Sequence, residues 1–260
     1  MATLKTPKDL ISIKRTPMTT LCLDFGNTRL KAAIFENALF KEEVFLPDDK
    51  TETIGQLLDT YHPEKSILSS VINQNEAIET LLSSKTIFHK ISHLTKINFT
   101  TPVGKPETIG ADRLALVAAA VHYYPGKNNL VIGLGSCITY NFVNQYNQFL
   151  GGSISPGMDM RFKAMSDFTA KLPLVQADWN FPLTGYDTKT NLQSGVITGI
   201  ASEIDGFIEK YDTKYGNFNV VLTGGNSTYF ASQLKNKIFA DYNFLFKGLY
   251  ALSELNNCRV

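Results

Sequence analysis

The sequence has little of several features that mark specialised classes of protein. It holds three cysteines, Cys22, Cys137 and Cys258, which are too far apart to form a metal-binding pair. Two of them fall in expected strands, which favours reduced core thiols in a cytoplasmic protein. The formal net charge is only +1, so no basic surface for nucleic acid or an anionic membrane is indicated. No apolar run reaches the ~18 residues that a membrane span needs.

The first part of the chain differs from the rest. It scatters four basic residues and two prolines through a short apolar patch, whereas a secretory signal needs a continuous apolar region of ~7–15 residues. We therefore expect residues 1–17 to be a loosely ordered extension. The whole chain has 260 residues, of which 43% are apolar. That is enough for a substantial core in one large domain or two modest ones, at ~100–200 residues each.

The stretch LCLDFGNTRLKAAIF, from Leu21 to Phe35, is typical of two antiparallel strands joined by a tight turn. Gly26 supplies the backbone freedom that the turn requires. Small polar side chains at such a turn leave backbone N–H groups free to hold a phosphate. Asp24, near the end of the first strand, places a carboxylate where Mg²⁺ could bind directly or through water. An ordinary hairpin without a ligand is the alternative interpretation of the same pattern.

A second stretch repeats this design about half a chain later. Leu130 to Val143 again indicates a strand, the turn residues Gly135-Ser136 and a strand, and a third apolar stretch follows each hairpin. The repetition predicts a duplicated β-β-β-α-β-α unit in an α/β fold of two similar domains, residues 18–127 and 128–260. Each domain would contribute one phosphate-binding turn to an interdomain nucleotide cleft. This arrangement resembles the RNase H-like domains of the actin-like, sugar-kinase and heat-shock ATPase superfamily.

Periodicity and turn residues predict the other elements. We expect helices at 51–61, 75–82, 114–124 and about 191–211, and strands at 66–72, 85–91 and 219–222. Another helix should follow Gly157, with Met158, Phe162, Met165 and Phe168 facing inward. In the long helix, Gly195 and Gly199 would permit close packing against another helix. His89 and His93 have a spacing that suits a metal on a helix, but they fall in strand and loop, which favours two surface histidines.

The segment PETIGADR, residues 106–113, precedes a helix that is apolar on all sides and is therefore expected to be buried. Asp112 and Arg113 then lie at the rim of whatever that helix supports. One interpretation makes Asp112 a favourable acid in the first turn of the helix. The other makes it a carboxylate that faces the cleft and deprotonates a substrate hydroxyl, while Arg113 holds an anionic group.

Near the end of the chain, a buried strand opens into the segment TGGNS, residues 223–227, and a further helix. Glycines between a strand and a helix N-terminus let a nucleotide approach the backbone closely. Gly224 and Gly225 are therefore a third candidate element of the nucleotide site.

The motifs DFGNT, PETIGADR, GGSISPG, TAKLP, the segment from Thr190 to Gly195 and TGG occur in this order between Leu21 and Asn257. Together they resemble the type III pantothenate kinases, a Baf-like family that starts coenzyme A biosynthesis. The resemblance implies a homodimer that uses ATP and Mg²⁺ to phosphorylate pantothenate to 4′-phosphopantothenate, with Asp112 as the proton acceptor. It implies ATP contacts at Asp24, Phe25, Gly26, Asn27, Thr28, Arg29, Leu30, Lys31, Ser136, Gly224 and Gly225. It implies pantothenate contacts at Val103, Gly110, Ala111, Asp112, Arg113 and Thr190, the last reaching the site of the partner subunit.

The chain also departs from the family's pattern, chiefly in its second hairpin. The family's motif DxGTxxTxD begins with an Asp that binds K⁺ or NH₄⁺, but Gly133 stands there and Asn141 replaces the closing Asp. Ser136 keeps the hydroxyl of the usual Thr, and Val103 replaces an aromatic residue at the pantothenate pocket. We therefore expect low activity with little response to K⁺. A non-catalytic nucleotide-binding homologue and a kinase for another small alcohol stay open as alternatives, because a fold does not fix a substrate.

Overall fold

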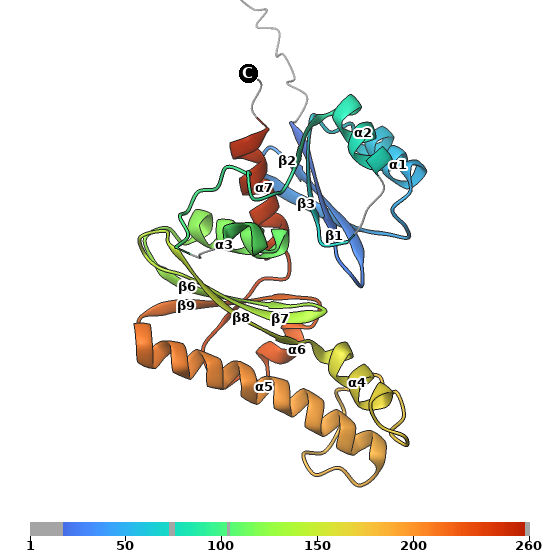
Figure 1. Cartoon of the computed structure of the whole chain (residues 1–260), viewed down its shortest axis with the longest axis vertical. Helices are drawn as coiled ribbons and strands as arrows, with labels where there is room; N and C mark the ends of the chain where they lie inside the picture. Colours follow the sequence, from blue (N-terminus) through green and yellow to red (C-terminus); the bar gives the residue numbers. More distant parts are fainter. Residues whose placement is uncertain (1–17, 73–75, 103–104, 258–260) are drawn as a thin grey trace, which may run out of the picture.

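The computed structural model describes residues 18–72, 76–102 and 105–257. The expected extension at residues 1–17, together with Val103 and Cys258, lies outside the described residues. Two five-stranded sheets form the framework. Figure 1 shows the two sheets at different levels of the molecule, with helices on both faces of each.

The first sheet has the strand order β3-β2-β1-β4-β5. Its strands are β1 (Thr19–Phe25), β2 (Leu30–Glu36), β3 (Leu39–Leu46), β4 (Lys65–Ser70) and β5 (Ile87–Lys90). Helices α1 (Thr51–Tyr61) and α2 (Glu76–Lys85) cover one face, and α7 (Phe244–Asn256) packs on the other. Because side chains alternate along a strand, Leu23 of β1 packs with α1 and α2 while Cys22 packs in the core that includes α7.

The second sheet has the order β10-β9-β6-β7-β8. Its strands are β6 (Asn128–Leu134), β7 (Cys137–Val143), β8 (Phe149–Pro156), β9 (Phe218–Gly224) and β10 (Phe239–Ala240). The long helix α5 (Thr188–Tyr215) runs along one face, where α4 (Met158–Asp167) and α6 (Ser227–Ala231) also lie. Helix α3 (Ala111–Tyr123) packs on the opposite face, after a short 3-10 turn at Pro106–Thr108.

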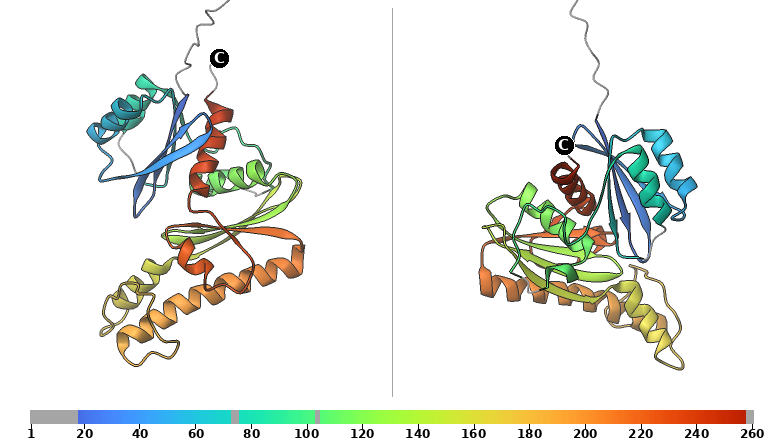
Figure 2. Two further views of the ribbon diagram at one scale, coloured as in Figure 1. Left: turned by 180° about the vertical axis from the view of Figure 1, so that it is seen from behind. Right: turned by 45° about the horizontal axis from the view of Figure 1, so that its top comes forward.

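Helices α3 and α7 pack against each other between the two sheets, as both views in Figure 2 show. Every residue of α3 from Leu114 to Val121 is buried. The contact is close at Gly248 of α7, where an added Cβ would lie 1.9 Å from the carbonyl oxygen of Ala115. The shared core therefore joins side chains of both sheets through two tightly packed helices.

The fold class predicted from the sequence is confirmed. Each sheet contains three antiparallel strands in succession, β1-β2-β3 and β6-β7-β8, and a later strand that pairs in parallel with the first. The division into residues 18–127 and 128–260 stays a prediction. Helix α3 packs on the second sheet although it precedes the proposed boundary, and α7 packs on the first sheet although it follows it.

One local prediction was wrong. Phe168, expected to face inward from α4, lies just beyond the end of that helix and is 89% exposed. Close packing of another helix at Gly195 and Gly199 stays a prediction, because an added Cβ at either position has no atom of the described chain within 4 Å. His89 bonds the hydroxyl of Thr95 through Nε2 at 2.9 Å, and no metal-binding cluster of three His, Cys, Asp or Glu residues occurs in the described ranges. No described helix is long and apolar enough to cross a membrane.

Candidate functional site

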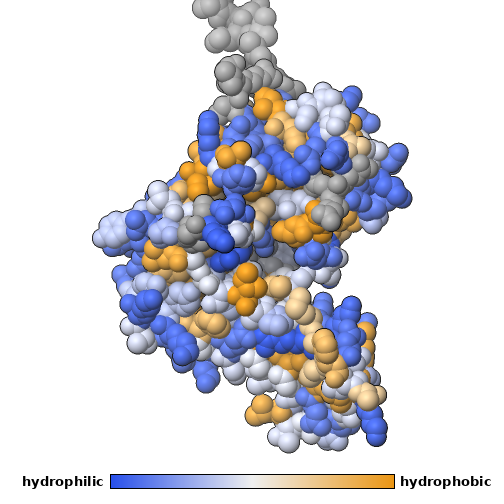
Figure 3. All heavy atoms as spheres, in the orientation of Figure 1, coloured by the Kyte–Doolittle hydropathy of each residue, from blue (hydrophilic) through white to orange (hydrophobic). Residues whose placement is uncertain are grey.

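The turns of the two predicted phosphate-binding hairpins meet in space. The hydroxyls of Thr28, after β1, and Ser136, after β6, are 2.6 Å apart and share a hydrogen bond. These residues are separated by 108 positions, and each lies in the turn between the first two strands of its sheet. Figure 3 shows the surface hollowed between the first sheet and the part of the molecule that contains α4. The hydroxyls of Thr28 and Ser136 and the backbones of both turns therefore lie side by side in one part of the surface.

Backbone contacts hold the two turns in shape. The N–H of Gly26 donates to the carbonyl oxygen of Arg29 at 3.1 Å, and that of Gly135 donates to Cys137 at 3.1 Å. Gly157 closes on the second turn, because its N–H donates to Ser136 at 3.0 Å and an added Cβ would lie 2.3 Å from the oxygen of Gly135. Only glycine fits there, so the motif GGSISPG positions the second hairpin.

The third glycine element lies beside the first two. Gly224 has a φ of +103°, and an added Cβ would lie 2.2 Å from the oxygen of Leu134, at the end of β6. The Cβ position of Gly225 is 3.9 Å from Nη1 of Arg29 in the first turn. The pair thus stands next to both hairpins, and its role in the nucleotide site stays a prediction. Helix α6 that follows has only five residues, so it adds little of a helix dipole.

Asp24 is the last residue but one of β1, and it lies on the face that is turned toward α3 and α7. It stands opposite Lys31 of β2 and Ser69 of β4 in the sheet register. Burial and the nearby carboxylate of Asp112 raise the pKa of Asp24 to about 7. The Ser69 hydroxyl and the Lys31 ammonium oppose this shift, although Ser69 Oγ meets no partner in normal hydrogen-bond geometry. The site is therefore short of positive charge at this point.

Asp112 lies in the first turn of α3 and shares this environment. Burial raises the pKa of its carboxyl, against the lowering effect of the Arg113 backbone N–H and guanidinium. The carboxylate folds back over Gly110, whose added Cβ would lie 2.5 Å from Asp112 Oδ1. The interaction with the backbone fits the helix-end role, and the electrostatic coupling with Asp24 fits the cleft-facing role. Both interpretations of Asp112 therefore stay predictions.

The donor set around Asp24 fits Mg²⁺ in the way nucleotide enzymes hold it. A carboxyl group whose pKa is raised by burial and by a second carboxylate nearby favours a divalent cation. The buried Ser69 hydroxyl, which lies beside Asp24, is a further oxygen that could contact a water in the ion's shell. With no cluster of three ligand residues in the described ranges, the remaining ligands would be water and phosphate.

Arg113 is directed toward the second sheet. Its Nε donates to Oδ1 of Asn141 at 2.7 Å, and its guanidinium lies over the ring of Phe149 at 5.5 Å. Ala111, beside the Asp–Arg pair, is half-buried. The two positions that depart from the family's second hairpin, Gly133 and Asn141, therefore lie on the face of the sheet that α3 covers.

Thr190 lies apart from the other predicted pantothenate residues. It is the third residue of α5, and its hydroxyl donates to the carboxylate of Asp187 at 2.7 Å in a reciprocal capping box. Helix α5 lies on the opposite face of the second sheet from α3, which carries Asp112. Within a single chain, Thr190 and Asp112 therefore lie on opposite sides of the second sheet. Val103 lies outside the described residues.

The structure adds residues that the sequence did not indicate. Lys31 Nζ donates to Glu43 of β3 at 2.7 Å and to the hydroxyl of Tyr242 at 3.1 Å, and it lies over the ring of Phe45. Tyr242 belongs to the second half of the chain, so this contact joins the halves beside the first hairpin. Phe45 is 54% exposed. The available signal in the sequence was an aromatic residue in the charged segment KEEVF, which follows the basic residues of the hairpin.

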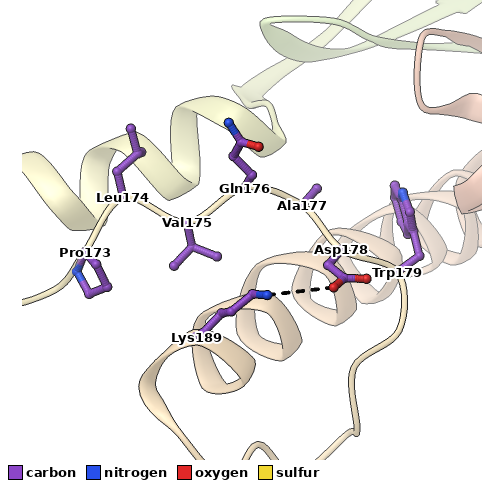
Figure 4. Close-up of a pocket in the computed structure, with 8 residues that line it drawn as sticks. All are labelled: Pro173, Leu174, Val175, Gln176, Ala177, Asp178, Trp179 and Lys189. Carbon is purple, nitrogen blue, oxygen red and sulfur yellow. Dashed lines mark ion pairs between the residues drawn. The ribbon is translucent and has the colours of Figure 1, made fainter.

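A separate pocket of about 590 Å³ lies beside the start of α5, away from the hairpin turns. Figure 4 shows it lined by the segment from Pro173 to Trp179 and by Lys189, whose ammonium is 3.9 Å from the carboxylate of Asp178. None of its lining residues was predicted as a site residue. The pocket adjoins Thr190 in sequence, through Lys189.

Comparison with known proteins identifies the family of the chain. A family model described as type III pantothenate kinase matches residues 20–210. The type III pantothenate kinase of Christiangramia forsetii is 42% identical over 238 residues, which cover 91% of this chain and 98% of that protein. The Bacteroides fragilis protein of the same name is 39% identical over 242 residues, covering 92% of this chain and 99% of its own.

Solved structures show the same fold at lower identity. A Baf family protein from Campylobacter jejuni aligns with a TM-score of 0.58 at 22% identity, over 91% of this chain and 98% of its own. A glucokinase from an Antarctic psychrotroph aligns with a TM-score of 0.51 at 12% identity, over 91% and 99%. At these identities the likeness concerns the fold alone. With the sequence relatives and the matched model, however, the conclusion is direct: the chain belongs to the type III pantothenate kinase family.

Proposed function

We propose that this protein transfers the γ-phosphoryl group of ATP to the hydroxyl of pantothenate, giving 4′-phosphopantothenate, the first step of coenzyme A biosynthesis. The observation that carries the proposal is the meeting of the two hairpin turns at Thr28 and Ser136, next to the coupled carboxylates of Asp24 and Asp112. Family membership supplies the substrate.

The residues of the chain divide the chemistry between them. Phosphoryl transfer depends on positioning and charge stabilisation more than on covalent chemistry. Backbone N–H groups around Thr28 and Ser136 would hold the phosphates, and Gly224 and Gly225 would let the nucleotide approach. Asp112 would accept the proton of the attacking hydroxyl. Its raised pKa brings the carboxyl nearer to neutral pH, where a general base works best.

Asp24 is the protein residue that would hold Mg²⁺, with the Ser69 hydroxyl as an outer contact. When bound, the ion would neutralise charge on the β- and γ-phosphates. With the pKa of Asp24 at about 7 in the absence of a cation, proton and metal compete for the same carboxylate near neutral pH. We therefore expect apparent Mg²⁺ affinity to rise as the pH increases through 7.

Two other functions stay as alternatives. The residues Gly133 and Asn141 favour a weakened or non-catalytic nucleotide-binding homologue, because carboxylates are missing where the family has them. A kinase for another small alcohol would use the same turns. Substrate-dependent ADP release, measured over pantothenate and a panel of small alcohols, separates the three. Release with pantothenate alone supports the proposal, release with another alcohol supports the second alternative, and no release with any supports the first.

We also propose that the protein is a homodimer in which Thr190 contributes to the partner's pantothenate site. Within one chain Thr190 lies across the sheet from α3. Several large apolar side chains on or near α4 and the start of α5 are exposed, among them Ile154, Met160, Phe168, Leu174, Leu183 and Tyr186. Gly195 and Gly199 of α5 leave open space for a closely packed helix. These features are typical of a surface that a second copy covers.

Mixing two inactive variants tests this arrangement. Asp112→Asn removes the base from one subunit and Thr190→Val removes the hydroxyl from the other. Mixed dimers should recover part of the activity if each site takes residues from two chains. The control is each variant assayed alone at the same total protein concentration. A monodisperse monomer in light scattering at micromolar concentration would rule out the dimer.

We propose that the protein is located in the cytoplasm and acts on small molecules. The substrates are metabolites of the cell interior, and the described cysteines Cys22 and Cys137 are unpaired thiols. The formal net charge of only +1 gives no support for a nucleic acid partner. Fractionation of cells that express the protein would check the location.

A further inference from the structure

The carboxylate of Glu203, on α5, joins three other elements of the second half of the chain. Its Oε1 accepts the hydroxyl of Tyr140 from β7 at 2.9 Å and that of Ser155 from β8, and its Oε2 accepts Nη2 of Arg161 from α4. Burial alone would raise the pKa of Glu203, but the hydrogen bonds from these three side chains bring that pKa below its usual value. Glu203 is therefore an ionised carboxylate that holds three donors at once.

Arg161 extends this network to the turn of the second hairpin. While its Nη2 binds Glu203, its Nε donates to the carbonyl oxygen of Pro156 at 2.8 Å. That carbonyl belongs to the same peptide unit as the N–H of Gly157, which donates to the carbonyl oxygen of Ser136 at 3.0 Å. A peptide unit is planar and rigid. The guanidinium therefore holds one end of this plane, and the turn binds the other end.

The packing around this peptide leaves little room for adjustment. Gly157 is buried, and an added Cβ would lie 2.3 Å from the carbonyl oxygen of Gly135 and 2.6 Å from that of Ser136. A shift of the 156–157 peptide therefore displaces the turn itself. The same turn carries the Ser136 hydroxyl that meets Thr28 of the first hairpin. The position of the second phosphate-binding turn thus depends on a side chain of α5.

We propose that Glu203 is a positioning residue of the nucleotide site, which acts through Arg161 and the 156–157 peptide to hold the second hairpin turn in its phosphate-binding geometry. This inference rests on the proposed function in that it takes this turn to hold a nucleotide phosphate. Without the carboxylate, the guanidinium loses the partner that orients it, and the turn occupies its binding geometry for only part of the time. The apparent affinity for a nucleotide falls in proportion to that fraction.

Calorimetry with ADP and Mg²⁺ tests the proposal. Glu203→Ala should weaken ADP binding by about 10–100-fold, the worth of a hydrogen bond to a charged group. Glu203→Gln should retain most of the affinity, because an amide turned with its oxygen toward Arg161 can donate to both hydroxyls. Glu209→Ala, which changes an exposed glutamate of the same helix, is the matched control and should bind ADP as the unaltered protein does.

Two further variants separate positioning from a purely structural role. Tyr140→Phe removes one donor from the same carboxylate, so it should lower the melting temperature, but the contacts of Arg161 stay and ADP affinity should not change. Arg161→Lys replaces the planar fork by a single ammonium, which cannot reproduce the bonds to both Pro156 and Glu203. It should weaken ADP binding as Glu203→Ala does, and it decides the question if Glu203→Ala fails to fold.

Other outcomes would overturn the inference. These are an unchanged ADP affinity in Glu203→Ala, or a loss of ADP affinity in Tyr140→Phe as large as that in Glu203→Ala. The expected loss of ADP affinity, in a protein whose unaltered form phosphorylates no pantothenate, would reject the proposed function alone. Phosphorylation of pantothenate, together with an unchanged ADP affinity in Glu203→Ala, would reject this inference alone.

Discussion

Gly110 controls the position of the proposed base, and Gly110→Ala tests that base without removing it. An added Cβ would lie 2.5 Å from Asp112 Oδ1, whereas ordinary contacts begin at 3.4 Å. The carboxylate must therefore move by about 1 Å or turn to another rotamer, and a misplacement of that size costs about 10²-fold in rate. The backbone of Gly110, at φ −58° and ψ 144°, is one that alanine adopts without strain.

The fold should tolerate this change. Gly110 is the N-cap of α3, where alanine in place of glycine costs less than ~1 kcal/mol. We expect turnover of pantothenate to fall about 100-fold, while the melting temperature and the affinity for ADP stay near those of the unaltered protein. Steady-state ADP release, thermal unfolding and calorimetry measure the three quantities.

Gly55→Ala is the matched control. Gly55 lies inside α1, and an added Cβ there has no atom within 4 Å. This variant should gain up to ~1 kcal/mol in stability from helix propensity and keep its turnover. Normal turnover in Gly110→Ala would refute the placement of Asp112 as the base. A large decrease in the melting temperature of Gly110→Ala would also contradict it, because unfolding could then explain the lower turnover.

Three further predictions follow from the same contacts. Asp112→Asn should keep the fold and ADP binding but lose about 10²–10⁴-fold in turnover, as stopped assays of ADP release would measure. Because the pKa of Asp24 is raised from 3.8 to about 7, the folded protein binds its proton more tightly than the unfolded chain, so metal-free stability should decrease from about pH 4 to about pH 7. Asp24→Asn should flatten that decrease in denaturant titrations, and an unchanged slope would contradict the shift. Gly248→Ala should destabilise the protein by at least ~1–3 kcal/mol in the same titrations, because its Cβ would overlap the Ala115 carbonyl of α3.

The sequence allowed the hairpins to be predicted because their signals are local. Alternating apolar residues interrupted by Gly26 or by Gly135 specify strand, turn and strand within a short window. The repeat predicted that each hairpin contributes a turn to one cleft, whereas the contact between Thr28 and Ser136 comes from the structure. Gly224 was predictable because glycines stand between a buried strand and a helix there, although its φ of +103° and its contact with Leu134 come from the structure.

Contacts between distant segments were beyond reach of the sequence. Arg113 and Asn141 are 28 positions apart on a helix and a strand, so no spacing rule joins them. The space at Gly133 is filled by Thr139 and Leu116, which makes the position unsuited to an added carboxylate.

The role of Thr190 in its own helix could have been foreseen. Asp187 and Thr190 have the spacing of a capping box, and they form one in the structure. The family resemblance predicts only substrate binding for Thr190. Thr190→Val would remove the cap as well as any contact with the partner's substrate, so Asp187→Ala, which removes the cap and keeps the Thr190 hydroxyl, is the variant that separates the two roles.

The measurement that tests the central claim most directly is identification of the product. Purified protein would be incubated with ATP, Mg²⁺ and pantothenate, and the products examined by phosphorus NMR and mass spectrometry. The account predicts 4′-phosphopantothenate and ADP in equal amounts, with Asp112→Asn giving neither above background. ADP without phosphorylated pantothenate, or equal product from Asp112→Asn, would contradict it.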